Sequence, residues 1–99
     1  MRLVYTNPVR DRIAEIRHFI AAETSFERAD KEITALLDKA DTLLQHPFRG
    51  ARVGTLASKG KGHRGLQVGR YKIIYYVQGD EIRITDLFDT KQHPSRIRD

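Results

Sequence analysis

The residues best suited to chemistry lie in the last third of the chain, in a basic glycine loop and the strands after it. The loop at residues 59–65 contains His63 and Arg64, and Lys72 and Lys91 follow on later segments. These residue types can activate a 2′-hydroxyl and stabilise the charge on a phosphorane without a metal. If the sheet is antiparallel, we expect them to converge, with Arg70, on one concave face. That arrangement would suit metal-free RNA cleavage.

The same loop has the composition of a phosphate cradle but not its context. Residues 59–65 lack Walker spacing, and a strand pattern rather than a helix follows them. We therefore interpret the segment as a flexible basic loop. It is either simply solvated or in contact with a phosphate backbone or an acidic protein.

No metal or nucleophile motif accompanies these basic residues. The histidines have no partner at i,i+4 and share no short motif with a carboxylate: His18, His46, His63 and His93. The serines lack the context of a nucleophile elbow: Ser25, Ser58 and Ser95. The chain has no cysteine. We expect no metal site and no cofactor.

Three tyrosines on one apolar strand could stack on bases. At strand spacing, Tyr71 and Tyr75 belong to the core face. Tyr76 lies on the other face with Lys72, and we take this pair as the candidate binding surface of the strand.

Two amphipathic helices are predicted ahead of these strands. The first runs from Pro8 to about Ala22, with Asn7 as its N-cap, after a short strand at residues 3–5. Thr24 and Glu27 have capping-box spacing and start a second helix, which ends at His46-Pro47. A short gap between two such helices predicts an antiparallel hairpin. Buried positions include Ile16, Leu36 and Leu37, and Phe26 and Leu44 also lie on the apolar stripe.

The rest of the chain predicts an antiparallel sheet. Strands are expected at residues 53–56, 66–68, 71–77 and 81–88, with Gly79-Asp80 as a two-residue turn. The strand at 71–77 is apolar on both faces, so it should be central, with Ile73 and Tyr75 buried. Asp86 lies in phase with Ile82 and Ile84, and a β-bulge or an edge position would expose it. The fold class is α+β: an N-terminal strand, then an antiparallel helical hairpin packed on a twisted, mainly antiparallel sheet.

Composition limits the remaining possibilities. The 99 residues form one domain (1–99) with a formal net charge of +5 and 39% hydrophobic residues. A basic surface favours acidic partners, although solubility alone can also explain it. The first residues turn polar too early for a signal peptide, and no apolar run is long enough to cross a membrane. We expect a cytoplasmic protein without membrane contacts.

The order of these patterns resembles the ParE/RelE toxin family of bacterial toxin–antitoxin systems. Residues 11–20 resemble the family's acidic–apolar helix with an aromatic–isoleucine end, and residues 44–50 its leucine–proline–glycine exit from the second helix. Residues 64–77 are similar to the central hairpin, and residues 87–94 to a C-terminal signature of ParE-like members. The resemblance covers nearly the whole chain.

The resemblance implies one of two targets. RelE-like toxins cut mRNA on the ribosome, whereas ParE-like toxins inhibit DNA gyrase and have no established nuclease activity. The RelE alternative would make four residues catalytic: His63, Arg64, Lys72 and Lys91. However, Gly65 stands where a second basic residue is expected, and no aromatic residue follows Phe88. These departures favour the ParE branch and a protein that is not an enzyme.

The resemblance also implies a cognate antitoxin. We expect the antitoxin to contact Arg64, Arg70 and Tyr76. In the ParE branch, Lys91, His93 and Arg96, near the last strand, would bind gyrase. In the RelE alternative, the partners are the ribosome and mRNA. A degenerate member kept only as a binding module is a third reading.

Overall fold

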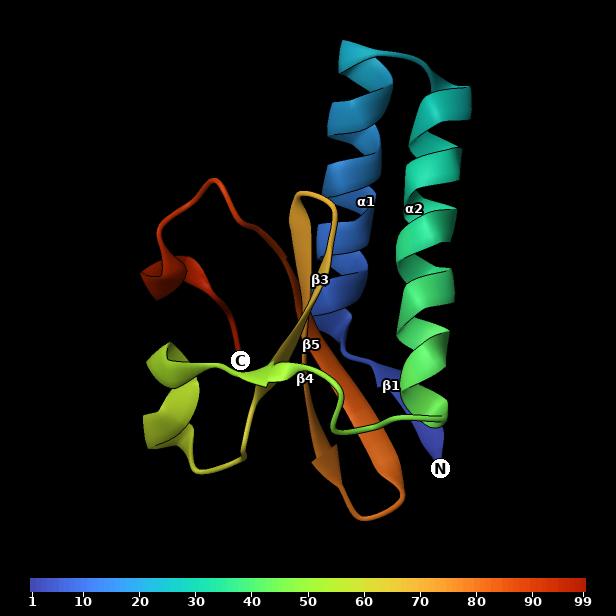
Figure 1. The fold of residues 1–99 in the computed structure, drawn as a ribbon. Coiled ribbons are helices and arrows are strands. Elements are labelled where there is room, and N and C mark those ends of the chain that lie inside the picture. The colour runs from blue at the N-terminus through green and yellow to red at the C-terminus, as the bar shows by residue number, and fades with distance from the viewer.

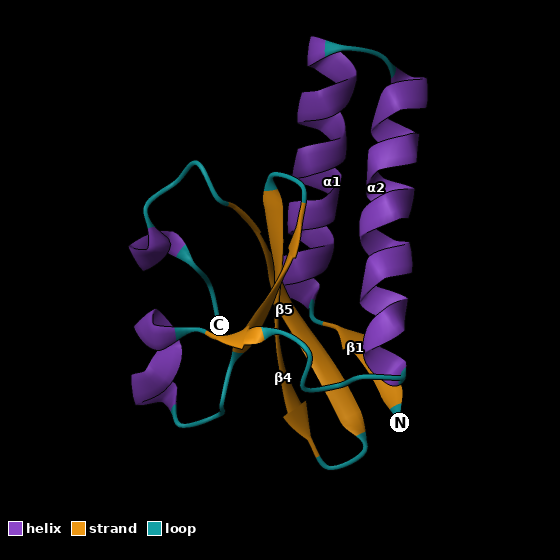
Figure 2. Ribbon diagram, in the orientation of Figure 1, coloured by secondary structure: helices purple, strands orange, loops and turns teal.

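A helical hairpin lies against one face of a five-stranded sheet in the computed structural model, which describes all 99 residues (Figure 1). The chain forms β1 (Arg2–Tyr5), α1 (Asn7–Glu23), α2 (Phe26–Asp41), β2 (Ala51–Arg52), β3 (Arg64–Val68), β4 (Tyr71–Gln78) and β5 (Glu81–Asp89). Short 3-10 helices cover Thr42–Leu44, Gly54–Lys59 and Pro94–Arg96. The strand order is β1-β5-β4-β3-β2, and only the β1–β5 pair is parallel (Figure 2). The predicted fold class is confirmed.

The helix ends differ from the predicted ones because neighbouring hydroxyls provide the caps. Thr6, not Asn7, caps α1 and accepts a hydrogen bond from the amide of Val9. Ser25, not Thr24, caps α2, while the Thr24 hydroxyl donates to the carbonyl of Ile20 at the end of α1. The second helix stops at Asp41, and a 3-10 turn continues toward the proline. Neither helix is long and apolar enough to cross a membrane.

The main core lies between the helices and the sheet. Ile16, Leu36, Ile73 and Tyr75 are buried there as predicted. Leu37 is only partly buried, because it lies beside the core stripe of α2 rather than on it. The prediction was wrong for Phe26 and Leu44, which are 74% and 39% exposed at the two ends of the second helical pattern.

A second, smaller cluster covers the opposite face of the sheet. The predicted strand at 53–56 is absent; instead the Gly54–Lys59 helix carries Leu56 against Ile74 and Phe88. Ile97 packs on the same cluster, since the C-terminal segment turns back over this face (Figure 1). On the same face Tyr76 is only 8% exposed, and the His63 ring lies against it. The expectation that it lies on an open surface is wrong.

Asp86 has the predicted bulge and edge position, but they do not expose it. Ile74 pairs with Asp86 and the next residue, Tyr75, pairs with Ile84, so Thr85 is the extra residue of a bulge. β1 pairs with β5 only as far as Ile84, which leaves the rest of β5 as an edge.

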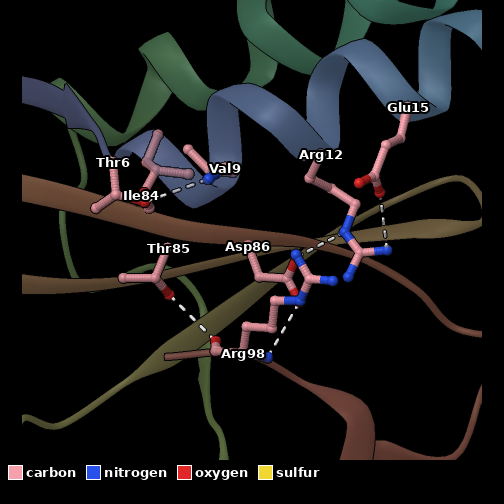
Figure 3. A network of polar contacts seen from close by, with 8 residues as sticks. All are labelled: Thr6, Val9, Arg12, Glu15, Ile84, Thr85, Asp86 and Arg98. Carbon is pink, nitrogen blue, oxygen red and sulfur yellow. Dashed lines mark hydrogen bonds and ion pairs between the residues drawn. The ribbon is translucent and has the colours of Figure 1, made fainter.

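Asp86 is nevertheless completely buried, because two segments cover that edge. Arg12 on α1 brings its Nε to 3.2 Å from Oδ1, and the amide of Arg98 donates to Oδ2 (Figure 3). The Thr85 hydroxyl donates to the carbonyl of Arg98. One carboxylate therefore joins the helical hairpin, the sheet and the C-terminal segment.

Candidate functional site

The basic residues proposed for RNA cleavage are divided between the two faces of the sheet. Arg64 pairs with Tyr75 and so shares the face that packs on the helices. Lys72 is three positions from Tyr75 on the same strand, and alternation places it on the opposite face. The predicted convergence is therefore wrong for the pair Arg64 and Lys72.

Arg64 binds the connector that follows the helices. Its Nη1 donates to the carbonyls of Gly50 at 2.9 Å and Phe48 at 3.2 Å. Its guanidinium also lies 5.3 Å from the centre of the Phe48 ring. These contacts fix residues 48–50 against the edge of the sheet, and this structural role accounts for the position of the side chain.

His63 is buried beside Tyr76 rather than presented to a substrate. The residue is 2% exposed, and its ring meets the Tyr76 ring edge-on at a centroid distance of 5.0 Å. Burial lowers the pKa of His63, an effect that the charge of Asp99 opposes and that of Lys61 reinforces. His63 and Lys72 share a sheet face, but the shielded imidazole is not presented as a general base there.

Lys72 occupies the space above the glycine that departs from the RelE-like pattern. A Cβ atom at Gly65 would lie 2.6 Å from Cδ of Lys72. The stem of this lysine therefore takes the place in which a side chain at position 65 would start. Gly65 thus has a packing explanation in this chain.

Lys91, His93 and Arg96 are exposed on the C-terminal segment, as expected of target-binding residues. The segment is not a free tail, because both of its ends are fixed. At one end the amide of Lys91 donates to Asp89; at the other Ile97 packs on the second cluster. In between, His93 caps the Pro94–Arg96 turn by accepting a hydrogen bond from the amide of Ser95.

Lys91 is also far from His63. Its neighbour Asp89 pairs with Tyr71 at one end of β4, whereas His63 contacts Tyr76. Five residues of strand separate these points, roughly 16 Å. The four residues of the ribonuclease alternative therefore do not form one site.

Arg70 lies at a groove between the helices and the β3–β4 turn. Its guanidinium donates to Asp89 through two nitrogens and lies 5.9 Å from the Phe19 ring centre. These hydrogen bonds hold the pKa of Asp89 below its usual value. The groove has a volume of about 480 Å³ and includes Phe19, Ile20, Leu36, Val68, Arg70 and Tyr71. The α1–α2 turn projects beyond the β3–β4 turn (Figure 1).

Comparison with known proteins decides the family. A family model described as "ParE toxin of type II toxin-antitoxin system, parDE" matches residues 3–94. The chain belongs to the ParE toxin family. The predicted resemblance is thereby confirmed, and with it the ParE branch as the family of this protein.

A solved structure also resembles this ParE-family chain. It is described as "Chromosomal ParDE TA system from P. aeruginosa", and it superposes with a TM-score of 0.76 at 22% sequence identity. The match covers 90% of this chain and 95% of that one, and at this identity it shows a common fold. No protein with a curated description matches the sequence.

Two surfaces of this ParE-family toxin thus remain as candidates: the groove at Arg70 and the cationic segment with Lys91, His93 and Arg96. Sequence reasoning missed Phe19, which is half exposed and lines the groove. The available signal was an aromatic side chain beside, rather than on, the apolar stripe of the first helix. It also missed Asp89, whose pairing with Arg70 depends on the β4–β5 register.

Proposed function

We propose that this ParE-family toxin inhibits growth by binding DNA gyrase through its C-terminal segment. The observation that carries the proposal is the presentation of Lys91, His93 and Arg96 on one exposed segment that is anchored at both ends. The carboxylates that flank the segment, Asp89 and Asp99, pair with Arg70 and Lys59 instead. The three side chains are therefore available to an acidic surface, and anchoring lowers the entropy lost on binding.

The ribonuclease alternative has weaker support. General acid–base catalysis needs groups within hydrogen-bond reach of the reacting atoms. Here His63 is buried, Arg64 and Lys72 lie on opposite faces, and Lys91 is at the other end of β4. This geometry favours a binding toxin over a metal-free nuclease.

We further propose that a cognate antitoxin neutralises the toxin by placing an amphipathic segment in the groove at Arg70. Phe19, Ile20 and Tyr71 provide apolar contacts. Arg70, which already binds Asp89, provides a cation that a carboxylate of the antitoxin can approach. Of the three residues expected to contact the antitoxin, only Arg70 borders this groove. Arg64 lies at the connector and Tyr76 is buried, so a contact with either remains a prediction.

The target is tested by expressing two triple variants and following plasmid supercoiling and mRNA integrity in parallel. Replacing Lys91, His93 and Arg96 with alanine should abolish growth inhibition and restore supercoiling. The matched control replaces Arg10, His18 and Lys31, which are exposed residues of the same three types on the helical hairpin. The control should remain toxic.

Two results would contradict the gyrase proposal. One is cleavage of mRNA by the wild type while supercoiling is untouched, which would restore the ribonuclease alternative. The other is no effect of the wild type on growth, supercoiling or mRNA, which would indicate a degenerate binding module.

The antitoxin groove is tested by a matched pair of phenylalanine substitutions. Phe19→Glu places a charge in the apolar groove and should weaken antitoxin binding about tenfold or more. Phe26→Glu places the same charge at another exposed phenylalanine, outside the groove, and should bind normally. Calorimetry with the purified antitoxin measures the affinity of each variant. Equal affinities would show that the antitoxin does not bind in this groove.

A further inference from the structure

A basic pocket lies beside the Gly54–Lys59 helix, remote from the groove at Arg70. It has a volume of about 510 Å³, and its lining includes Arg52, Gly54, Gly60, Lys61, Gly62 and His63. No carboxylate lines it. Neither the proposed gyrase contact nor the proposed antitoxin groove uses these residues.

The two cations of the pocket have no carboxylate partner. Arg52 and Lys61 make no ion pair, whereas the neighbouring Lys59 pairs with Asp99 at 3.3 Å. Nζ of Lys61 lies 5.2 Å from the centre of the Tyr76 ring, the same ring that His63 contacts. Lys61 and His63 thus approach Tyr76 from the same loop, and the positive charge of the pocket is not balanced within it.

His63 supplies the observation that points to a ligand. It is 98% buried, and neither ring nitrogen makes a hydrogen bond of ordinary geometry, although the backbone of Asp99 lies close enough to oppose the lowering of its pKa by burial. A buried polar group without a partner is costly, so such groups are rare and call for an explanation. A neutral imidazole carries one N–H donor, which suits a phosphate oxygen held by neighbouring cations.

The loop backbone also permits close approach. Gly60 and Gly62 both have φ near +71°, a region that favours glycine, and a Cβ atom at either position would meet no atom within 4 Å. No side chain therefore shields the loop at these two positions. A ligand can approach the backbone beside Lys61.

Asp99 places one anionic group beside the loop that forms this pocket, at Lys59. Its carboxylate binds Lys59, and its charge acts on His63 strongly enough to oppose the effect of burial on the pKa. A stronger anion would compete with Asp99 for the same positive charge.

We propose that the pocket of Arg52, Lys61 and His63 binds the phosphate group of a small phosphorylated ligand, and that this group displaces the Asp99 side chain. Arg52 and Lys61 neutralise the phosphate, and the imidazole of His63 donates one hydrogen bond to it. The same displacement moves the backbone of Asp99 away from the imidazole, whose nitrogens are shielded from solvent in this conformation.

The experiment is a titration of the isotopically labelled full chain with inorganic phosphate, followed by ¹H–¹⁵N NMR. Sodium chloride at matched ionic strength provides the baseline. We expect saturable shifts confined to residues 52 and 59–63 and to Asp99. Shifts that chloride reproduces, or that do not saturate, would overturn the proposal.

Exposed variants make the titration specific without disturbing the core. Lys61→Ala should weaken phosphate binding about tenfold, since it removes one charged contact. Asp99→Asn should strengthen binding, because it removes the competing anion. Lys31→Ala on α2 removes the same charge elsewhere and should change nothing. If the loop is purely structural, Lys61→Ala and Asp99→Asn should not change the phosphate affinity in opposite directions. Such a result would refute the phosphate site.

A second pair of probes distinguishes the source of the phosphate. Adenosine 5′-monophosphate binding more tightly than phosphate would show that the pocket also contacts the nucleoside, and equal affinity would show that the phosphate suffices. Both results support the proposal. Adenosine binding as tightly as its monophosphate would overturn it.

Discussion

Arg12 and Asp86 form the most deeply buried ion pair of the protein. The Asp86 side chain is 1% exposed and that of Arg12 is 20% exposed. Such pairs stabilise little in net terms, because desolvation offsets their attraction, but removing one partner leaves an uncompensated buried charge. The pair therefore serves mainly to hold α1 to the edge of β5 and to the C-terminal segment (Figure 3).

Replacing Arg12 with alanine should lower the free energy of unfolding by about 3–5 kcal/mol, because Asp86 keeps only its bond from the amide of Arg98. The control is Arg17→Ala on the same helix. That residue pairs with Asp30, and both side chains are more than half exposed, so its loss should cost about 1 kcal/mol or less. Urea denaturation measures both. Equal losses of unfolding free energy for Arg12→Ala and Arg17→Ala would show that the buried pair contributes no more to stability than an exposed one.

His63 should make the stability of the protein depend on pH. Burial lowers its pKa in the folded state, so the unfolded chain takes up the proton first as the pH falls. Stability should therefore decrease as the pH falls through about 6.5 and level off below the folded-state pKa. His63→Phe should flatten this part of the profile, measured in phosphate-free buffer between about pH 7.5 and 5.

A direct titration of His63 in the wild type provides the check if the phenylalanine variant fails to fold. Its ring resonances should titrate below the ordinary histidine value. A value at or above that of an unfolded histidine would contradict the assignment of a buried, neutral ring.

The residue types of the candidate site could be predicted from the sequence, but the exposure of their side chains could not. His63 and Tyr76 were taken as surface residues because the face of β4 that carries Tyr76 seemed open. That face is covered by Leu56 and Ile97, two residues that are distant in the sequence from each other and from β4. No local pattern contains this information.

At the scale of elements, the connector between α2 and β2 is fixed by a close approach to β3. The amide of Gly50 donates to the Tyr75 hydroxyl at 2.9 Å, and a Cβ atom at Gly50 would lie 2.8 Å from the carbonyl oxygen of Gly65. Both groups belong to the sheet, so neither can move without disturbing strand pairing.

Gly50→Ala should therefore destabilise the fold by about 1–3 kcal/mol, as overpacking does. Gly65→Ala is the matched control, since the Cβ atom it adds meets the flexible stem of Lys72 rather than backbone. It should cost less. Thermal denaturation measures the stability of both variants. A larger loss of stability for Gly65→Ala than for Gly50→Ala would show that the close approach at Gly50 does not fix the connector.

The elements themselves could largely be predicted because each has its own periodicity. The helical hairpin, the central strand and the Gly79-Asp80 turn all follow from local patterns. One exception is the short strand β2, which lies in a segment predicted as a connector. The other is the segment at 53–56, for which a strand was predicted. In that segment a 3-10 helix buries Leu56 against Ile74 and Phe88, and this tertiary contact overrides local propensity.

At the scale of the whole molecule, the two surfaces proposed to bind partners lie largely on different sides of the sheet. One side carries the helical hairpin and the groove at Arg70, which we assign to the antitoxin. The other side carries the Gly54–Lys59 helix and the returning C-terminal segment (Figure 1). Of these two, the C-terminal segment is the one that we propose to bind gyrase. The two surfaces meet at Asp89, which accepts hydrogen bonds from Arg70 and from the amide of Lys91. An antitoxin in the groove would therefore neutralise the toxin by blocking access to the C-terminal segment.

The family could be recognised from the sequence because its patterns occur in order along nearly the whole chain, as the match over residues 3–94 confirms. The division of basic residues between two faces could not be predicted. It depends on the β3–β4 register, which pairs Arg64 with Tyr75 and so places it on the face opposite Lys72.

Whether the protein acts on DNA gyrase is decided by a supercoiling assay with the purified enzyme. Relaxed plasmid, ATP and gyrase are incubated with increasing amounts of the protein, and the supercoiled product is measured on a gel. The wild type should block supercoiling in a concentration-dependent manner, and the Lys91, His93 and Arg96 triple-alanine variant should require at least about tenfold more protein. Full supercoiling at wild-type concentrations that suffice to cut mRNA on the ribosome would contradict the account.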